Sequence, residues 1–401
     1  MPNSILTIDM ITRKSLEILE NNLVLTRNIN RQYDDSFANQ GAKIGTNVRI
    51  RLPDRVLVTD GAALQVQDTD EQFVNFPVTS QKHVGINFTT AELTMSMDDF
   101  ADRILKPRIS QLAASIDADV MGAFTDIAQS VGVAGTVPST SLVLLQAQQK
   151  LNESAAGMAP RYATVSPAAN AGLVEGLKGF FNPTTTISRQ FKTGMMGEGV
   201  LGYDEINMSQ SVRTFTTGTR TNGTMSAAVT VQGSTSLALT GLGANATIRN
   251  GEVLTVANVF AVNPQTREST GSLNDFVVVG DFTASAGGAV TVTVAPGIFT
   301  SSQALATVDS FPASGAVVTF RGAASAVSPQ NLVYHRDAIT FATADLIMPR
   351  GVDMASRQSH NGISMRIVRQ YDINNDRMPC RIDVLYGYKV IRREMAVRMW
   401  G

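Results

Sequence analysis

Apolar and polar positions recur with different periods along the chain, and these periods predict where its helices and strands lie. Over residues 5–25 the apolar side chains return every three or four positions, which is typical of an amphipathic helix. A polar stretch over residues 28–35 follows, and its composition indicates an arm or linker. Apolar and polar side chains alternate over residues 47–52, and residues 84–88 predict a second strand. These two strands bracket a long acidic connection, so they indicate a protruding β-loop.

The strongest helical pattern runs over residues 97–131. Its apolar stripe consists of Phe100, Ile104, Leu112, Ile116, Val120, Phe124 and Ile127. Ser96 suits the N-cap, and Asp98 and Asp99 place negative charge in the first turn, where it complements the helix dipole. Pro107 should kink the helix or mark its true start. At 1.5 Å per residue the helix would be roughly 50 Å long, which indicates a strut and not a ligand cradle.

Helical and strand-like patterns mix over residues 141–212, and the composition then changes abruptly. The mixed region predicts helices over residues 142–151 and 168–177 and a strand over residues 163–165. From about residue 213 the chain is mostly Thr, Ser, Gly, Ala and Val, with β-branched runs for strands and glycine pairs for turns. The runs lie at residues 229–231, 253–256, 276–279 and 290–294. No helix of useful length fits here, so the region predicts a separate all-β module.

The mixed character returns after residue 328, with predicted strands over residues 364–368 and 381–390. A β module spliced between two pieces of one α/β domain is the simplest account of this order, because insertions are tolerated at surface loops whose ends lie close together. Within the module, Arg213, Arg220, Arg249, Arg267 and Arg321 balance Glu252, Glu268, Asp275, Asp281 and Asp309. From this autonomous pattern and balanced charge we hypothesise that the module aids the folding and stability of the chain.

Composition and charge exclude several classes of function. Apolar residues make up 43% of the 401 residues and charged residues 17%. Because this charged fraction is below the roughly 25% usual in soluble domains, we expect a large core and self-association. A net charge of −1 argues against sequence-reading contact with DNA. Cys380 is the single cysteine, which excludes intrachain disulfides and indicates a reducing compartment. No signal-peptide pattern and no run near ~18 apolar residues occurs, so we expect a cytoplasmic protein that does not enter a membrane.

Motifs for chemistry are absent or out of context. Residues 197–202 read GEGVLG, a literal GxGxxG, but no buried strand precedes it and no helix follows, so a turn is the better interpretation. The three histidines and Cys380 form no zinc-ligand spacing, and we interpret Cys380 as a buried, inert thiol. Asp98 and Asp99 are better explained as helix-start charges than as catalytic carboxylates. The sequence therefore predicts no catalytic residue, no cofactor and no metal.

Four stretches together resemble a known family of shell proteins. They are Val84 to Phe100 running into the helix, Gly202-Tyr203-Asp204-Glu205-Ile206, Val259 to Thr266 with Phe276-Val277-Val278, and Leu385-Tyr386-Gly387-Tyr388. In order and spacing the chain is similar to major capsid proteins of the HK97 type, in the P22 coat-protein-like branch with an insertion domain. The resemblance spans nearly the whole chain.

The resemblance implies an α+β, HK97-like capsid fold with an inserted all-β domain. We expect an N-terminal arm over residues 1–35, an extended β-loop over 36–92, and a spine helix with the first part of the α/β core over 93–212. The inserted domain should occupy residues 213–326 and the second part of the core residues 327–401. The α/β parts should form the peripheral and axial domains of the fold.

The implied function is that of a major capsid protein that assembles with itself, as pentons and hexons, into an icosahedral shell around a phage double-stranded DNA genome. Further implied partners are a scaffolding protein, a portal protein, non-specifically packaged DNA and a decoration protein, with assembly in the host cytoplasm and residence in the virion. Three alternatives stay open: a non-viral nanocompartment shell, a phage tail or surface-layer protein, and, as the weakest, an enzyme.

Charged residues of the β-loop are the candidate subunit interface. We hypothesise that Arg49, Arg51 and Arg55 meet acidic groups of an adjacent subunit; an equally open interpretation is that they are solvated. The acidic candidates are Asp68, Asp70 and Glu71, which lack the spacing of a calcium loop.

Two departures from the resembled family matter. Residues 231–251 are nearly uncharged, so the charged insertion-loop contact of the P22 coat protein is in doubt, and no lysine lies between Lys43 and Lys82 to cross-link through the loop. Near the C-terminus, Arg392, Arg393 and Arg398 could contact DNA, although solvated or intersubunit roles are as plausible.

Overall fold

The structure is a computed structural model, and it describes residues 8–31, 47–58, 61–62, 66, 72–88, 105–176, 196–374 and 377–401. The chain is mixed α and β, as the sequence predicts, and it divides into two compact units. The first unit comprises Met1–Arg51, Phe73–Val120 and Ile339–Lys389, and the second comprises Leu52–Gln72, Met121–Ala338 and Val390–Gly401. Each unit is therefore assembled from segments that are distant in sequence.

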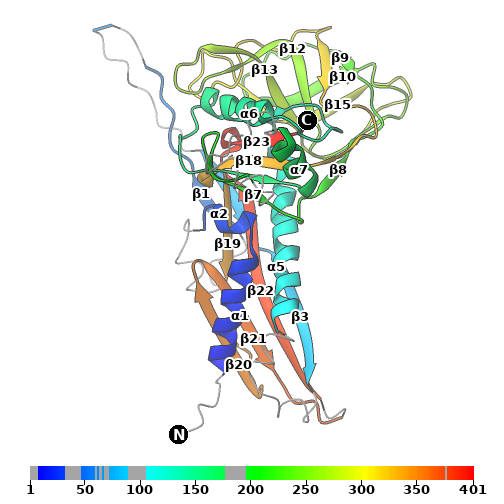
Figure 1. Ribbon diagram of the computed structural model, residues 1–401. Helices are drawn as coiled ribbons and strands as arrows, with labels where there is room; N and C mark the ends of the chain where they lie inside the picture. Colours follow the sequence, from blue (N-terminus) through cyan, green and yellow to red (C-terminus); the bar gives the residue numbers. More distant parts are fainter. Residues whose placement is uncertain are drawn as a thin grey trace. The chain divides into compact units, whose positions relative to one another are not determined.

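The first unit is a β-sheet with two helices, α1 and α5, lying along it (Figure 1). Its strands, in order, are β19 (Ile339–Ala344), β22 (Met378–Val390), β21 (Ile363–Arg369) and β20 (Met354–His360), and β3 (Ser80–Phe88) also pairs with β22. Helix α1 (Ile8–Asn22) packs on β20 and β21, and the side chain of Ser110 in α5 (Lys106–Met121) lies 3.4 Å from that of Asn22. The strands predicted over residues 364–368 and 381–390 are confirmed as β21 and β22.

The apolar stripe of α5 explains why this helix packs into the first unit. Ile109, Leu112, Ile116 and Val120 recur at three- and four-residue spacings, and all four are buried. Of the stripe predicted from the sequence, Leu112, Ile116 and Val120 are therefore confirmed on the helix. The positions of Ser96, Asp98 and Asp99 lie outside the described residues.

The prediction of a helix as far as residue 131 was wrong at its C-terminal end. Helix α5 ends at Met121, a 3-10 turn covers Gly122–Asp126, and Ser130–Val131 forms β4. Gly122 weakens the helix at this point because glycine loses more backbone freedom in a helix than any other residue. The two residues of β4 gain a parallel pairing with β23 instead.

The segment after α1 packs into the first unit, although its polar composition predicted an arm. Helix α2 (Leu25–Asn28) follows α1, and both Leu25 and Ile29 are completely buried. The N–H of Asn30 donates to the carbonyl oxygen of Ile339 (3.2 Å), which joins this segment to β19. The arm prediction was therefore wrong for residues 28–31, because single apolar side chains among the polar ones anchor the backbone. Residues 32–35 lie outside the described part.

The second unit contains a six-stranded sheet with two helices. The strand order is β4 (Ser130–Val131), β23 (Ala396–Met399), β18 (Asn331–His335), β5 (Arg161–Val165), β7 (Tyr203–Met208) and β6 (Gly197–Val200). Helix α6 (Ser141–Glu153) packs on β23 and β4, and Leu173 of α7 (Pro167–Gly176) joins the same buried cluster as Leu144 and Leu151 of α6. The two helices and the strand predicted between residues 142 and 177 are confirmed.

The inserted segment of the second unit closes into a β-barrel. At its entry and exit β8 (Thr214–Thr216) pairs with β17 (Val327–Pro329). The barrel runs β10 (Ser234–Thr240), β15 (Val290–Ile298), β13 (Ser269–Val278), β12 (Val253–Val262), β16 (Val317–Phe320) and β9 (Gly223–Met225). Its strands alternate, so Val292 and Val294 face the core while Thr291 and Thr293 are exposed. Closure leaves the barrel without a free strand edge.

The all-β character of the insertion is confirmed, since residues 213–326 are all described and none is helical. The predicted strands over residues 253–256, 276–279 and 290–294 lie within or overlap β12, β13 and β15. The strand predicted over residues 229–231 was wrong. Val229 is buried, but its N–H donates to the carbonyl oxygen of Pro312. The segment is therefore held by this hydrogen bond and does not pair with a neighbouring strand.

Candidate interaction surfaces

An extended hairpin carries the first candidate surface. Strand β1 (Asn47–Arg51) pairs with β2 (Phe73–Pro77), while β3 pairs with β22. The strand predicted over residues 47–52 is confirmed, but its partner is β2 and not the strand over residues 84–88. The connection between β1 and β2 exposes three large apolar side chains: Val56 is 66% exposed, Val58 78% and Val66 84%. Apolar side chains gathered on one extended loop indicate contact with another surface.

The loop arginines occupy different environments. Arg49 lies in β1 opposite Asn75, and Arg51 is exposed at the end of the strand opposite Phe73. Arg55 forms an ion pair within the chain, with its Nη2 2.8 Å from Oε1 of Glu394, a partner that sequence reasoning did not single out. The acidic candidates Asp68, Asp70 and Glu71 lie outside the described residues. Their pairing with arginines of another subunit stays a prediction.

Arg398 marks the contact between the barrel and the six-stranded sheet. It lies in β23, is 1% exposed, and donates through Nε and Nη2 to Oε1 of Gln330 (2.9 and 2.6 Å) and through Nη1 to the carbonyl oxygen of Gly251 (2.5 Å). Its guanidinium carbon lies 5.1 Å from the ring centre of Phe124 and 4.9 Å from that of Trp400. The suggestion that Arg398 contacts DNA is therefore wrong, because the side chain is sealed inside the second unit.

Burial also changes the acidity of Arg398. Removal from water lowers the pKa of its guanidinium to about 9, and the negative charges of Glu252 and Asp275 offset part of that effect. Both carboxylates come from the barrel. The charge of Arg398 is thus stabilised across the junction by residues that the insertion supplies.

Two buried carboxylates hold the barrel side of this junction. Asp275 in β13 accepts the N–H of Ser130 (3.0 Å), pairs with Lys150 of α6, and lies 3.0 Å from Nη2 of Arg321. Glu252, before β12, pairs with Nε of Arg220 at 2.6 Å. Asp275 therefore links the barrel to both β4 and α6, and Glu252 closes a fully buried ion pair within the insertion.

Helix α5 carries two further carboxylates that sequence reasoning missed. Asp117 accepts the N–H of Val24 (2.6 Å) and both the N–H (3.1 Å) and hydroxyl (2.5 Å) of Thr26; burial raises its pKa. Asp119 lies 2.6 Å from Nζ of Lys82 and accepts the hydroxyl of Tyr386 (2.7 Å). These contacts tie α5 to the segment after α1 and to two strands of the first sheet. The sequence signal that could have identified Asp117 and Asp119 is their position beside the apolar stripe of a predicted helix.

The remaining candidates for chemistry give no site. Residues 197–202 form the β6–β7 hairpin, with positive φ at Gly197, Gly199 and Gly202, so the βα turn of a dinucleotide fingerprint is not built there. Burial raises the pKa of the Cys380 thiol to about 11, which keeps it protonated at neutral pH. Within the described ranges no group of three metal-ligating side chains gathers, and no helix is long and apolar enough to cross a membrane.

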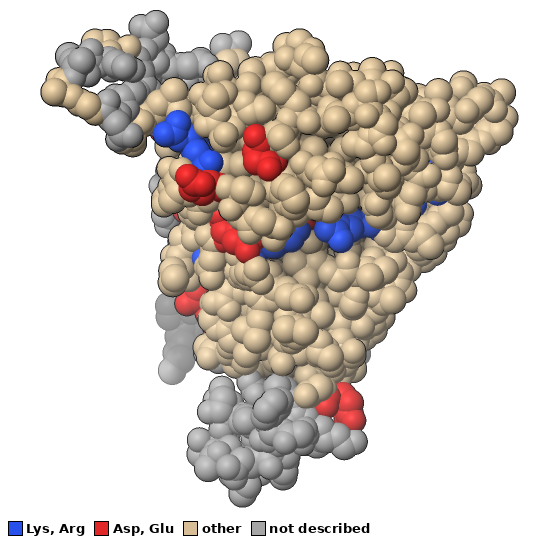
Figure 2. All heavy atoms as spheres, turned by 90° about the horizontal axis from the view of Figure 1, so that it is seen from above, with Lys and Arg blue, Asp and Glu red and all other residues tan. Residues whose placement is uncertain are grey.

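The barrel presents hydroxyl groups where many surfaces present charge. Ser236, Thr291, Thr293 and Thr319 are exposed on its strands, and Ser236 pairs with Thr293 across the ladder. Figure 2 shows a face of the molecule on which charged side chains are sparse. The low charge content found in the sequence is therefore a property of this surface and not only of the core.

One protein family matches nearly the whole chain. A family model described as "P22 coat protein - gene protein 5" matches residues 3–401. No curated protein matches the chain in sequence. Solved structures with a similar chain include "Mycobacterium phage Che8" (12% identity, 94% of this chain and 90% of that chain, TM-score 0.48) and "Capsid structure of the Cyanophage P-SCSP1u" (11%, 89% and 83%, 0.42). A virus-like particle from Pyrococcus furiosus is a third (8%, 97% and 96%, 0.39).

Proposed function

The chain belongs to the P22 coat protein family, and from that premise we propose how it builds a shell and with which partners. It is the major capsid protein of a phage, it assembles with itself into an icosahedral shell, and its location is the virion capsid. The observation that carries this function is the family match over residues 3–401. A nanocompartment shell and a tail or surface-layer protein are not favoured by it.

The proposal extends to the division of labour along the chain. We assign residues 1–35 to an N-terminal segment whose described part packs on the first unit, 36–92 to the extended β-loop, 93–212 and 327–401 to the α/β core, and 213–326 to the inserted domain. The order of these segments and the HK97-type fold expected from the resemblance support the assignment. The chain has no enzymatic role in this proposal, because its function would be mechanical contact between copies.

The proposed partners follow from assembly of a DNA-filled shell. They are a scaffolding protein and a portal protein during assembly in the host cytoplasm, double-stranded DNA inside the shell, and a decoration protein outside it. A net charge of −1 supports loose, non-specific contact with DNA, since tight phosphate binding requires an excess of basic side chains. We propose no covalent cross-link through the loop, because the loop has no lysine between Lys43 and Lys82.

Shell formation in this proposal depends on many weak contacts repeated by symmetry. The loop between β1 and β2 exposes Val56, Val58 and Val66, and their burial on a neighbouring copy supplies an apolar part of the interface. Extended segments that overlap a neighbour bury large areas, which is typical of obligate interfaces. The exposed valines support a role of this loop in binding between copies.

The charged part of the proposed interface joins Arg49, Arg51 and Arg55 to the acidic group Asp68, Asp70 and Glu71 of a neighbouring copy. Arg51 is the test position because its side chain is exposed. The Arg51→Glu variant should assemble poorly and form less stable shells, whereas the same reversal at Arg267, in a turn of the barrel, should not. Assembly and shell stability of Arg51→Glu equal to those of the wild type would remove this contact from the proposal.

The inserted barrel is proposed to aid the folding and stability of the chain. Its own buried core and the buried pair of Arg220 and Glu252 support independent stability. Residues 213–325 expressed alone should give a dispersed NMR spectrum. An unfolded spectrum would end the claim of autonomy.

Electron microscopy tests the function as a whole. The purified chain should be imaged after expression with and without the neighbouring phage genes. Closed shells of uniform diameter are the expected result. A small, monodisperse oligomer under both conditions would contradict the function.

A further inference from the structure

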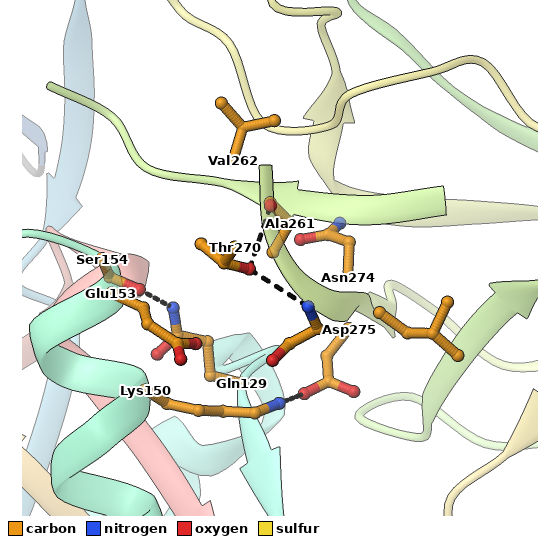
Figure 3. A pocket seen from close by; sticks show the side chains of 11 residues that line it. Gln129, Lys150, Glu153, Ser154, Ala261, Val262, Thr270, Asn274 and Asp275 are labelled. Carbon is orange, nitrogen blue, oxygen red and sulfur yellow. Dashed lines mark hydrogen bonds and ion pairs between the residues drawn. The ribbon is translucent and has the colours of Figure 1, made fainter. Parts of the chain in front are cut away.

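A polar groove opens beside the junction between the barrel and the six-stranded sheet. In Figure 3, Lys150 and Glu153 reach in from α6 and Ser154 from its C-cap, while Thr270, Asn274 and Asp275 lie on the β12–β13 side. An adjoining hollow of about 110 Å³ shares Gln129, Ser154, Asn274 and Asp275 with the groove and extends it to Arg55, Arg393 and Glu394.

Asn274 lines the groove with a buried amide that has no partner. The residue is 9% exposed, and its Nδ2 donates to no atom. It lies within the first of two irregularities of the β12–β13 ladder, because Thr255 pairs with Asp275 and Phe260 pairs with Leu273. At this irregularity β12 has four residues, 256–259, where β13 has Asn274 alone, and bulges often re-aim a side chain beside a functional site.

Gln129 supplies the opposite hydrogen-bonding group in the same groove. Its Nε2 donates to the hydroxyl of Ser154, while its Oε1 is buried and accepts no hydrogen bond. The groove thus holds one unused donor and one unused acceptor. Because an unpaired buried polar group costs free energy, each of them destabilises the isolated subunit.

The chemistry of the two groups defines what would satisfy them. A donor and an acceptor held together match a peptide unit, which offers one C=O and one N–H. The charged side chains around the groove balance, with Arg55, Lys150 and Arg393 against Glu153, Asp275 and Glu394. A balanced lining favours an uncharged segment, and exposed uncharged segments are abundant in a chain with 17% charged residues.

We propose that the groove binds an extended, uncharged main-chain segment of a second copy of this chain, with Asn274 donating to its carbonyl oxygen and Gln129 accepting its N–H. This inference rests on the proposed function, because shell assembly surrounds every groove with copies of the same chain. The groove is then an intersubunit contact, and its unpaired polar groups lower the stability of the free subunit.

The Asn274→Leu variant of the full-length chain separates this role from a structural one. The leucine side chain has a similar size and removes the unused donor. The urea midpoint of the unassembled subunit should stay the same or rise, while the critical concentration for shell formation should rise about tenfold, as expected for one lost hydrogen bond per contact. The matched control is Asn222→Leu. Oδ1 of Asn222 accepts the N–H of Phe320 (3.0 Å), so this variant should lower the subunit midpoint and leave assembly unchanged.

A second measurement does not depend on folding of the variant. A photoreactive benzophenone amino acid at position 153 of the otherwise wild-type chain should cross-link to another copy in shells and not in unassembled subunits. No interchain cross-link in shells, or equal assembly of Asn274→Leu and wild type, would overturn the inference and indicate that ordered water fills the groove. A defect that appears only when other phage proteins are present would overturn the choice of a second copy. Failure of the wild type to form any shell would overturn the proposed function, and this inference with it.

Discussion

Asp275 offers the sharpest test of how the barrel is held on the rest of the second unit. The Asp275→Asn variant keeps an oxygen for the N–H of Ser130 and loses the attraction to Lys150 and Arg321. These cations are 19% and 34% exposed, so they can turn to water, and the expected loss of unfolding free energy is about 1 kcal/mol. The Asp275→Leu variant also leaves the buried N–H of Ser130 without an acceptor, which raises the expected loss to about 3 kcal/mol.

The assay uses Trp400, the single tryptophan of the chain. Trp400 packs with Val253, Val277 and Ala295 of the barrel and with Ala128 and Ala134 of the adjoining segment, so its fluorescence reports the junction. In urea the midpoint of the Trp400 fluorescence transition of Asp275→Leu should fall by about 1 M, given a slope of about 3 kcal/mol per M. The midpoint of the far-UV circular dichroism transition of the same chain should move less. Coincident fluorescence and dichroism transitions at the wild-type midpoint would refute the assignment of Asp275 as a junction residue.

Three further variants or measurements test the buried groups. The pKa of Arg398 is lowered to about 9 in the folded chain, so above that pH the unfolded chain binds more protons than the folded chain. The unfolding free energy of the wild type relative to Arg398→Met should therefore rise by about 1.4 kcal/mol per pH unit above pH 9. An unchanged difference between pH 8 and 10 would contradict this. Since burial raises the pKa of Cys380 to about 11, iodoacetamide at pH 8 should label the native thiol at least about tenfold more slowly than the thiol in urea; equal rates would show an accessible thiolate. The Asp117→Leu variant removes the acceptor of Val24 and Thr26 and should cost about 3 kcal/mol in urea unfolding, whereas a cost below about 0.5 kcal/mol would mean that the segment after α1 is held by apolar contacts alone.

The elements that follow one short-range pattern were predictable from the sequence. Strands β21 and β22 can be predicted from the local alternation of apolar and polar residues, and the barrel can be predicted from β-branched runs between glycine turns. The end of α5 was not predictable in the same way, because Phe124 continues the apolar spacing while its ring packs edge-on against Phe215, centroid to centroid 5.4 Å apart. Its spacing fits a helix although its partner is a distant strand.

Most of the functional contacts could not be predicted from the sequence, because their partners are far apart along the chain. Asp117 reaches Thr26 across 91 positions, and Asp275 reaches Lys150 across 125. Arg398 looks in the sequence like any basic residue near Arg392 and Arg393, and only the closed junction shows that it is buried. The carboxylates carry no local mark that distinguishes a buried partner from a solvated one.

The strands that complete the two sheets are made late. Strand β22 lies inside the first sheet, paired on both sides, and β23 lies inside the second, yet they come from Met378–Val390 and Ala396–Met399. The barrel, by contrast, has all of its strands once Phe320 has been added. A ribosome that stops short of β22 therefore releases a chain whose barrel can close while both sheets lack an inner strand. Incomplete chains of this kind would present no finished surface for another copy to bind, so the order of synthesis itself would exclude truncated subunits from the shell.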